Sequence, residues 1–214
     1  MPNKHVHVCF MTDINHTMKN HIGALKDRFE TILDAVQNQY PTSVIEVAFV
    51  GYSAVLDIPS DYFEPFTTNR KLLQRKMKNG NVSFGFSREC RMVVEGYTMV
   101  SNLNWRFANR IMFHMGNAPA HGSRYHDDTV DDRFKYGHPY WTLEEQVEKV
   151  AAMEIDVVIL KISKTTTIME KIMQESYQKI REHGFYVVDL TKHLNNLDDA
   201  VYNAVKSHML RIMT

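Results

Sequence analysis

Hydrophobic residues follow two different spacings along this chain, and the two spacings alternate. Short continuous apolar runs rich in β-branched and aromatic residues predict buried strands. They lie at His5–Met11, Ile45–Tyr52, Ile111–Met115, Asp156–Ile162 and Phe185–Leu190. Apolar residues three or four positions apart predict amphipathic helices between these runs. The helical patterns cover Ile22–Val36, Thr142–Met153, Thr166–His183 and Leu197–Ile212.

The middle of the chain is less regular. Pro65 has no backbone N–H to donate, so the stretch Asp61–Thr68 predicts a short strand at a sheet edge. The stretch Ser87–Asn104 has apolar positions compatible with a helix, although Gly96 weakens that prediction. Three further segments are a basic helix at Asn69–Lys78, a turn at Asn79–Asn81 and a long loop at Gly116–Tyr140.

Strands that alternate with helices of this length predict right-handed βαβ units, and therefore a mostly parallel sheet. We expect an α/β fold in which helices cover both faces of a doubly wound, six-stranded sheet. The chain has 214 residues, of which 44% are hydrophobic, and this is enough for one sizeable core. Because no linker or low-complexity tract divides the sequence, we expect a single domain spanning residues 1–214.

Charge and cysteine content bear on location and partners. Acidic and basic residues balance at 25 each, so no overall field directs the chain to nucleic acid or to a membrane surface. Two cysteines, Cys9 and Cys90, are too few for a disulfide scaffold. The first residues lack the apolar core of a secretory signal, and no apolar run approaches the roughly 20 residues that cross a bilayer. These features predict a cytoplasmic protein.

Polar residues follow two of the predicted strands, at the carboxyl ends where open α/β sheets bind ligands. Asp13, Asn15 and Thr17 alternate along the first loop, and Asn117 follows the strand Ile111–Met115. Carboxylate, hydroxyl and amide oxygens suit hard cations such as Mg²⁺. The same residue types cap helix N-termini, so the spacing alone leaves a metal site and a helix cap both open. Phosphate binding is disfavoured because the loop has no glycine-rich turn.

Several motifs resemble those of von Willebrand factor type A domains, in the intracellular branch associated with alpha-type protein kinases. The first strand with its loop, the second strand VAFVGYS and the segment MGNAPAHGSRYH at Met115–His126 carry the resemblance. It continues through the segment Trp141–Leu190 and so covers nearly the whole chain. The resemblance implies a Rossmann-like fold with a site for a divalent cation at the strand tips.

In that family the cation occupies a metal-ion-dependent adhesion site. The resemblance implies that Mg²⁺ or Mn²⁺ would be held here by Asp13, Asn15, Thr17 and Asn117. The amide of Asn117 replaces a family carboxylate and removes one negative charge, while Arg88 and Arg91 stand where the family has an acidic stretch. We therefore expect a cation site that is weakened or lost. We also hypothesise that a guanidinium pairs with Asp13 in place of the metal.

The long loop and its borders carry histidines, acids and aromatic residues. The candidate metal ligands there are His114, His121, His126, His138, Asp127, Asp128, Asp131 and Asp132. Their spacing matches no helical or zinc-finger motif, so we expect His121 and His126 to bond to loop backbone and the acid run from Asp127 to Asp132 to form a solvated face. Cys90 is a weak nucleophile candidate because no base can be assigned to it. The aromatic residues, which either pin the loop to the core or form a recognition surface, are Phe134, Tyr136, Tyr140 and Trp141.

The resemblance and the strand-tip chemistry together predict a non-catalytic protein-interaction module with a degenerate metal-ion-dependent adhesion site. The expected partner is a protein, and the expected partner-binding face consists of His121, Arg124, Tyr125 and His126. Two alternatives remain open. One is a small metal-dependent or nucleotide-using enzyme of Rossmann-like form, although the sequence offers it neither a glycine-rich turn nor paired carboxylates. The other is a regulatory fragment related to alpha-kinases.

Overall fold

The computed structural model describes residues 5–39, 41–54, 62–78, 90–192, 199, 201–203 and 206. The expected turn at Asn79–Asn81, Arg88 and most of the expected helix Leu197–Ile212 lie outside the described residues. Within that last stretch, positions 199, 201–203 and 206 are helical, as expected.

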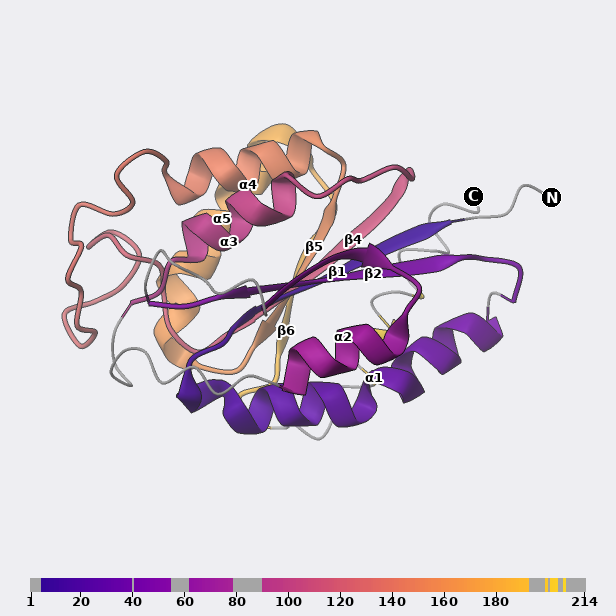
Figure 1. Cartoon of the computed structure of the whole chain (residues 1–214). Helices are drawn as coiled ribbons and strands as arrows, with labels where there is room; N and C mark the ends of the chain where they lie inside the picture. The colour runs from indigo at the N-terminus through magenta and orange to yellow at the C-terminus, as the bar shows by residue number, and fades with distance from the viewer. Residues whose placement is uncertain are drawn as a thin grey trace.

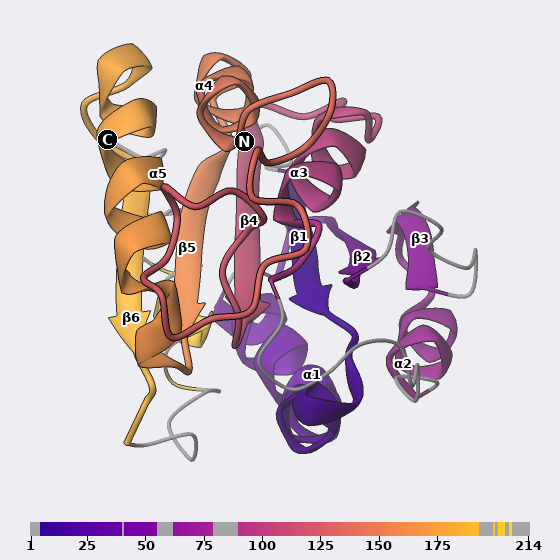
Figure 2. The ribbon, with the colours of Figure 1, turned by 90° about the vertical axis from the view of Figure 1, so that its left-hand side faces the viewer.

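The described strands form a six-stranded sheet with the order β3-β2-β1-β4-β5-β6 (Figures 1 and 2). Their bounds are β1 Val6–Asp13, β2 Ile45–Tyr52, β3 Phe63–Thr67, β4 Asn109–Gly116, β5 Asp156–Lys161 and β6 Phe185–Asp189. Neighbouring strands are parallel except β2 and β3, which are antiparallel. The strand that contains Pro65 lies at the sheet edge, where a residue without an N–H is tolerated. The predicted α/β fold with a mostly parallel sheet is confirmed.

Helices cover both faces of the sheet (Figure 1). Helices α1 (Lys19–Gln39) and α2 (Arg70–Lys78) lie on one face, and α3 (Val93–Ser101), α4 (Leu143–Ala152) and α5 (Thr167–Ile180) lie on the other. Two short 3₁₀ helices, η1 (His16–Met18) and η3 (Lys164–Thr166), lead into α1 and α5. Among the described residues, no helix combines the length and apolar character needed to cross a membrane.

Strand β1 lies at the centre of the sheet and is buried on both sides. All eight of its residues are buried. Val8 and Phe10 pack in the core shared with α1 and α2, whereas Cys9 and Met11 pack in the core shared with α3, α4 and α5. A strand between two helical layers needs apolar residues on both faces, which explains why its sequence reads as a continuous hydrophobic run.

Helix α3 lies close to the sheet because it contains a glycine. A Cβ atom added to Gly96 would lie 3.0 Å from Met11 Sδ and 3.2 Å from Tyr52 Cδ1. Glycine has a low helix propensity, which is why this position weakened the prediction of a helix. Packing against β1 and β2 outweighs that propensity, and the helix forms.

The segment between β4 and α4 extends across the carboxyl end of the parallel strands (Figures 1 and 2). It corresponds to the long loop expected from the sequence, and the structure keeps it free of helices and strands from residue 117 to 142. The polar residues that the sequence places at the strand tips are therefore close to this loop.

Candidate functional site at the strand tips

The loops that follow β1 and β4 meet at the carboxyl edge of the sheet. β1 lies between β2 and β4, so the winding of the chain reverses between β1 and β4, the position where such sheets bind ligands. The side-chain amide of Asn117 donates a hydrogen bond to Thr17 Oγ1 at 2.9 Å. The hydroxyl of Thr165 donates to the backbone carbonyl of Asn117, also at 2.9 Å. Polar groups that follow β1, β4 and β5 thus lie together.

Asn15 caps the helical segment that begins after β1. Its backbone N–H donates to Asp13 Oδ1 at 2.9 Å, and its own side-chain oxygen accepts from the backbone N–H of Thr17 at 3.2 Å. Asn15 is the N-cap residue of η1, which continues directly into α1. The structure therefore supports the helix-cap interpretation of Asn15, because its oxygen satisfies a backbone donor that the helix leaves unpaired.

Arg91 forms an ion pair with Asp13 inside the protein. Its Nε donates to Asp13 Oδ2 at 3.0 Å, and both side chains are fully buried. The backbone of Arg91 is held on two sides: its N–H donates to Pro119 O at 2.8 Å, and its carbonyl accepts from the N–H of His121 at 3.2 Å. The loop after β4 thereby fixes the position of the guanidinium. The hypothesis that a guanidinium pairs with Asp13 agrees with this geometry.

The electrostatics of the pair follow from its burial. Burial raises the pKa of the Asp13 carboxyl, and the positive charge of Arg91 together with the N–H of Asn15 opposes that rise. Arg91 thus supplies the compensating charge that a buried carboxylate needs. Removal of the guanidinium would leave the buried carboxylate of Asp13 without its counter-charge.

The residues present do not fit a divalent cation at this position. Asp13 Oδ1 accepts from Asn15 and Oδ2 accepts from Arg91, so each carboxylate oxygen already has a donor. Thr17 Oγ1 accepts the amide of Asn117, and Asn15 Oδ1 accepts the N–H of Thr17. A dication beside Asp13 would also be repelled by the guanidinium 3.0 Å from the carboxylate. The four residues predicted as ligands lie together, but they bond to one another and to Arg91.

A buried tyrosine–histidine pair lies beneath the strand tips. Tyr52, the last residue of β2, and His114 in β4 form a hydrogen bond of 2.8 Å between Oη and Nε2. Burial lowers the pKa of His114 to about 3, so the imidazole is neutral in the folded protein at ordinary pH. Gly116 leaves room for this pair, because a Cβ there would lie 2.2 Å from Tyr52 Oη. His114 is a core residue, and it stands apart from the loop histidines.

Asp132 organises the loop through four hydrogen bonds. It accepts from His121 Nδ1 at 2.6 Å, from the N–H of Gly122 at 2.8 Å, from the N–H of Phe134 at 2.9 Å and from His126 Nε2 at 3.1 Å. Burial acts to raise the pKa of Asp132, but these donors outweigh it and lower the pKa to about 2. This corrects the expected bonding pattern, since His121 bonds to a side chain and His126 bonds both to Asp132 and to the carbonyl of Asp127.

The other acids of the loop behave as the sequence suggested. Asp127, Asp128 and Asp131 are exposed. The carboxylate of Asp127 accepts from the N–H of Thr129 at 3.0 Å, which stabilises a local turn. Asp132 differs from these three acids because its side chain is buried, at 1% exposure.

Most of the expected partner-binding face is buried. His121 and Tyr125 are only 4% and 3% exposed. Tyr125 Oη donates to Glu144 Oε2 at 2.5 Å and accepts from the N–H of Leu143 at 3.2 Å, so it fixes the loop to the start of α4. Among the four residues of that face, the Arg124 side chain is strongly exposed, at 63%. In this structure His121 and Tyr125 are therefore not available to a docking partner.

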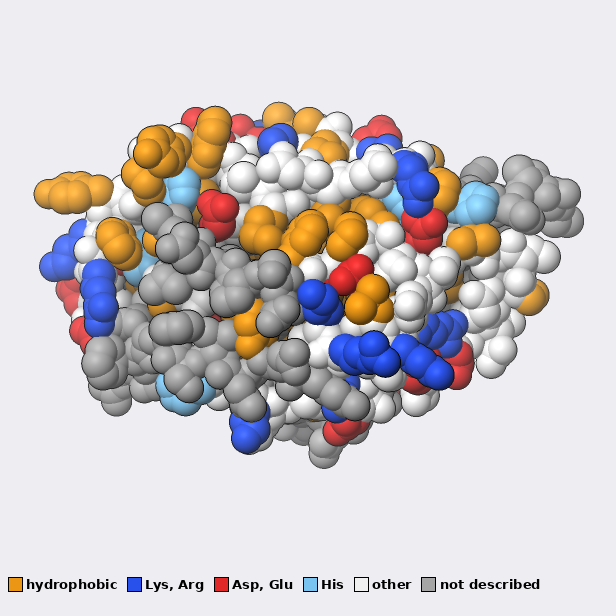
Figure 3. Space-filling view, in the orientation of Figure 1, with side chains coloured by type: hydrophobic (Ala, Val, Ile, Leu, Met, Phe, Trp, Pro, Cys, Tyr) orange, Lys and Arg blue, Asp and Glu red, His pale blue; other side chains and the backbone are white. Residues whose placement is uncertain are grey.

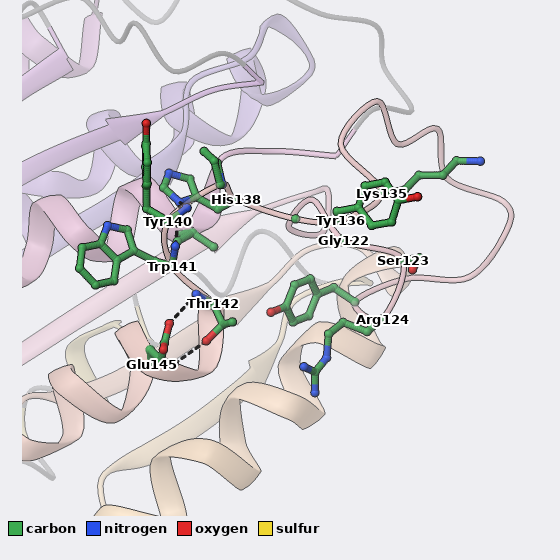
Figure 4. A pocket seen from close by; sticks show the side chains of 14 residues that line it. Gly122, Ser123, Arg124, Lys135, Tyr136, His138, Tyr140, Trp141, Thr142 and Glu145 are labelled. Atoms are coloured by element: carbon green, nitrogen blue, oxygen red, sulfur yellow. Dashed lines mark hydrogen bonds between the residues drawn. The ribbon is translucent and has the colours of Figure 1, made fainter.

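The exposed surface lies instead on the aromatic part of the loop. We define the aromatic surface as the four exposed aromatic residues of this segment: Phe134 (48%), Tyr136 (105%), Tyr140 (79%) and Trp141 (49%). The last three line a cavity of about 380 Å³, and Arg124 and His138 also line it (Figure 4). Figure 3 shows hydrophobic side chains projecting from the left end of the molecule, where the segment between β4 and α4 lies in Figure 1. The interpretation that these residues pin the loop to the core does not fit such exposure.

A cluster that the sequence did not reveal joins Cys90 to two residues of the loop. One potential ligand atom from each of Cys90, His121 and Asp132 lies within 4.8 Å of the others. The isolated parallel bridge between Arg91 and Ala120 brings these segments together. The sequence offered no base for Cys90, because the partner histidine follows the next strand along the chain and only tertiary structure brings it close.

The chain matches no protein-family model, and it matches no curated protein sequence. Similar solved structures exist at low sequence identity. The pilus adhesin SpaC from Lactobacillus rhamnosus GG, in an open conformation, aligns over 98% of this chain and 30% of its own, with 13% identity and a TM-score of 0.61. The D319A mutant of the PilB minor pilin from Streptococcus sanguinis aligns over 99% of this chain and 62% of its own, with 10% identity and a TM-score of 0.54.

Proximal thread matrix protein 1 from the mussel byssus is a third similar structure. It aligns over 95% of this chain and 47% of its own, with 9% identity and a TM-score of 0.52. The chain therefore spans less than two thirds of the length of each of these proteins. At these identities the likeness establishes a shared α/β fold.

Proposed function

We propose that this chain is a non-catalytic protein-binding module of the von Willebrand factor type A kind, in which Arg91 takes the place of the divalent cation. The observation that carries the proposal is the aromatic surface beside the strand tips. Four large aromatic side chains within eight consecutive positions are exposed there. Exposed tyrosine and tryptophan clusters are typical of protein-protein interfaces, because these side chains bury much area at a low cost in conformational entropy.

The buried ion pair supports binding that is independent of a cation. In a metal-dependent adhesion site, the cation would bridge the module and an acidic side chain of the partner. Here Asp13 is paired with Arg91 and both are fully buried, so neither reaches a partner's surface. Contact through the aromatic surface needs no metal. The same occupation of Asp13 disfavours the alternative of a metal-dependent enzyme at this position.

The similar structures and the sequence resemblance point in the same direction. The structures with the same fold are described as a pilus adhesin, a minor pilin and a thread matrix protein, none of which is named as an enzyme. The motifs at Met115–His126 favour the von Willebrand type A family. The relation to alpha-kinases and the cytoplasmic location remain predictions from the sequence.

The proposal predicts that a partner protein contacts the aromatic surface directly. A photoreactive phenylalanine analogue at position 136 should cross-link one partner protein in a lysate of the source cells, and EDTA should leave the yield unchanged. Placing the same analogue at position 186 gives a matched control, because Tyr186 is an exposed aromatic residue near the amino end of β6, whereas the loop lies at the carboxyl end of the parallel strands. We expect no shared adduct from that position.

A second variant makes the cross-linking result quantitative. Trp141→Ala, combined with the analogue at position 136, should reduce the adduct at least tenfold, since truncation of a central aromatic contact costs about 2 kcal/mol or more. Circular dichroism should show an unchanged fold, because Trp141 is half exposed. An adduct that depends on added Mg²⁺, or one that persists in Trp141→Ala, would refute the proposed binding mode.

A further inference from the structure

We propose that Cys90 and His121 bind a thiophilic cation such as Zn²⁺, and that Asp132 orients the histidine. This site is separate from the hard-cation position at Asp13, and the proposal does not rest on the protein-binding function. It concerns the cluster of Cys90, His121 and Asp132, in which Cys90 is fully buried and His121 is 4% exposed.

The geometry is close to that of a metal site. One potential ligand atom from each of Cys90, His121 and Asp132 lies within 4.8 Å of the others. In a tetrahedral zinc site with bonds of 2.0–2.3 Å, ligand atoms lie about 3.3–3.8 Å apart. A shift of at most about 1.5 Å therefore brings these atoms to the separation that two ligands of one zinc ion have.

The hydrogen bonds assign different roles to His121 and Asp132. Asp132 already accepts four hydrogen bonds, including one from His121 Nδ1 at 2.6 Å, so its oxygens are in use. His121 Nε2 is buried and has no hydrogen-bond partner among the described residues. An imidazole that donates one N–H to a carboxylate and keeps the other nitrogen available is the usual arrangement of a metal-binding histidine.

A buried nitrogen lone pair without a partner costs free energy, and a bound cation would satisfy it. The ligand chemistry then selects the type of ion. Thiolate and imidazole favour Zn²⁺ over the hard cations Mg²⁺ and Mn²⁺. Binding converts the Cys90 thiol and free Zn²⁺ into a thiolate–zinc bond and releases one proton to the solvent.

Zinc at this position would strengthen the strand-tip arrangement. Cys90 precedes Arg91, and the N–H of Cys90 donates to Asp131 O at 3.1 Å. A Cys90–zinc–His121 link would join the segment that carries Arg91 to the loop that contains Asp132. The ion would therefore hold Arg91 beside Asp13 more firmly, and the melting temperature should rise when Zn²⁺ is added.

Cobalt absorption spectroscopy on the EDTA-treated full chain gives the sharpest test. We expect Co²⁺ to bind at one ion per chain, with a thiolate-to-cobalt charge-transfer band in the near ultraviolet that an equivalent of Zn²⁺ abolishes. Cys9→Ala is the matched control and should keep the band, because Cys9 is buried in β1 and does not belong to the cluster. Cys90→Ala should lose the band, and Asp132→Asn should weaken binding about 10- to 100-fold.

The control decides the outcome even if Cys90→Ala fails to fold. The chain has two cysteines, so a charge-transfer band that survives in Cys9→Ala identifies Cys90 as the thiolate. The proposal is overturned if wild-type protein shows no such band, or if Cys9→Ala removes it. A band that persists in folded Cys90→Ala would overturn it as well.

Discussion

Replacing Arg91 by methionine should lower the free energy of unfolding by about 3–5 kcal/mol. Methionine keeps much of the buried volume but removes the positive charge. The Asp13 carboxylate then stays buried without a counter-charge or takes up a proton at a cost in free energy. Urea denaturation of the wild type and of Arg91→Met measures the difference.

Two further variants separate the effect of charge from the effect of packing. In Asp13→Asn combined with Arg91→Met, neither charge remains, so we expect most of the lost stability to return. Arg70→Met serves as the control arginine, because Arg70 pairs with Glu30 and Asp34 at a partly exposed position on α2, and its loss should cost less than about 1 kcal/mol. A double variant as unstable as Arg91→Met would mean that packing, and not the buried charge, dominates.

Acidification from pH 7 to pH 5 should destabilise the wild type by about 2 kcal/mol more than it destabilises His114→Gln. Burial lowers the folded-state pKa of His114 to about 3, whereas an unfolded histidine titrates near 6.5. As the pH falls below 6.5 the unfolded chain takes up a proton that the folded chain cannot. Stability is therefore highest above pH 6.5 and declines until the pH approaches the folded pKa.

Unfolding free energies at a series of pH values test this prediction. Glutamine keeps an acceptor for the Tyr52 hydroxyl, and the comparison uses the change with pH, so a constant loss of stability in the variant does not matter. Other buried histidines such as His7 contribute equally to both proteins, which leaves the difference specific to His114. His16→Gln, at an exposed position, is the control. Parallel pH profiles for wild type and His114→Gln would contradict the account.

The sequence was most informative where local pattern and tertiary packing agree. The runs at His5–Met11 and Ile45–Tyr52 are largely apolar and rich in β-branched and aromatic residues, and these two properties together indicate strands inside a parallel sheet. The order of strands and helices then leaves few ways to wind the chain. Helix α3 was harder to predict, because Gly96 lowers the helix propensity and its packing role against Met11 and Tyr52 appears only in three dimensions.

The candidate site was predictable in part. The arginine beside Asp13 could be hypothesised because Arg91 stands where the family that the sequence resembles has acidic residues, but its burial depends on the backbone bonds to Pro119 and His121. The sequence could not decide the role of the aromatic residues, because it does not distinguish an aromatic residue that pins a loop from one that faces solvent. The burial of Tyr125 and the proximity of Cys90 to His121 follow from loop conformation, which no periodicity encodes.

Isothermal titration with Mn²⁺ tests the central claim most directly, namely that a guanidinium occupies the place of a divalent cation. The account predicts that wild-type protein gives no saturable heat that depends on Asp13, and that its titration matches that of Asp13→Ala. Saturable binding of one Mn²⁺ per wild-type chain, lost in Asp13→Ala, would show that the cation still binds and that Arg91 does not replace it.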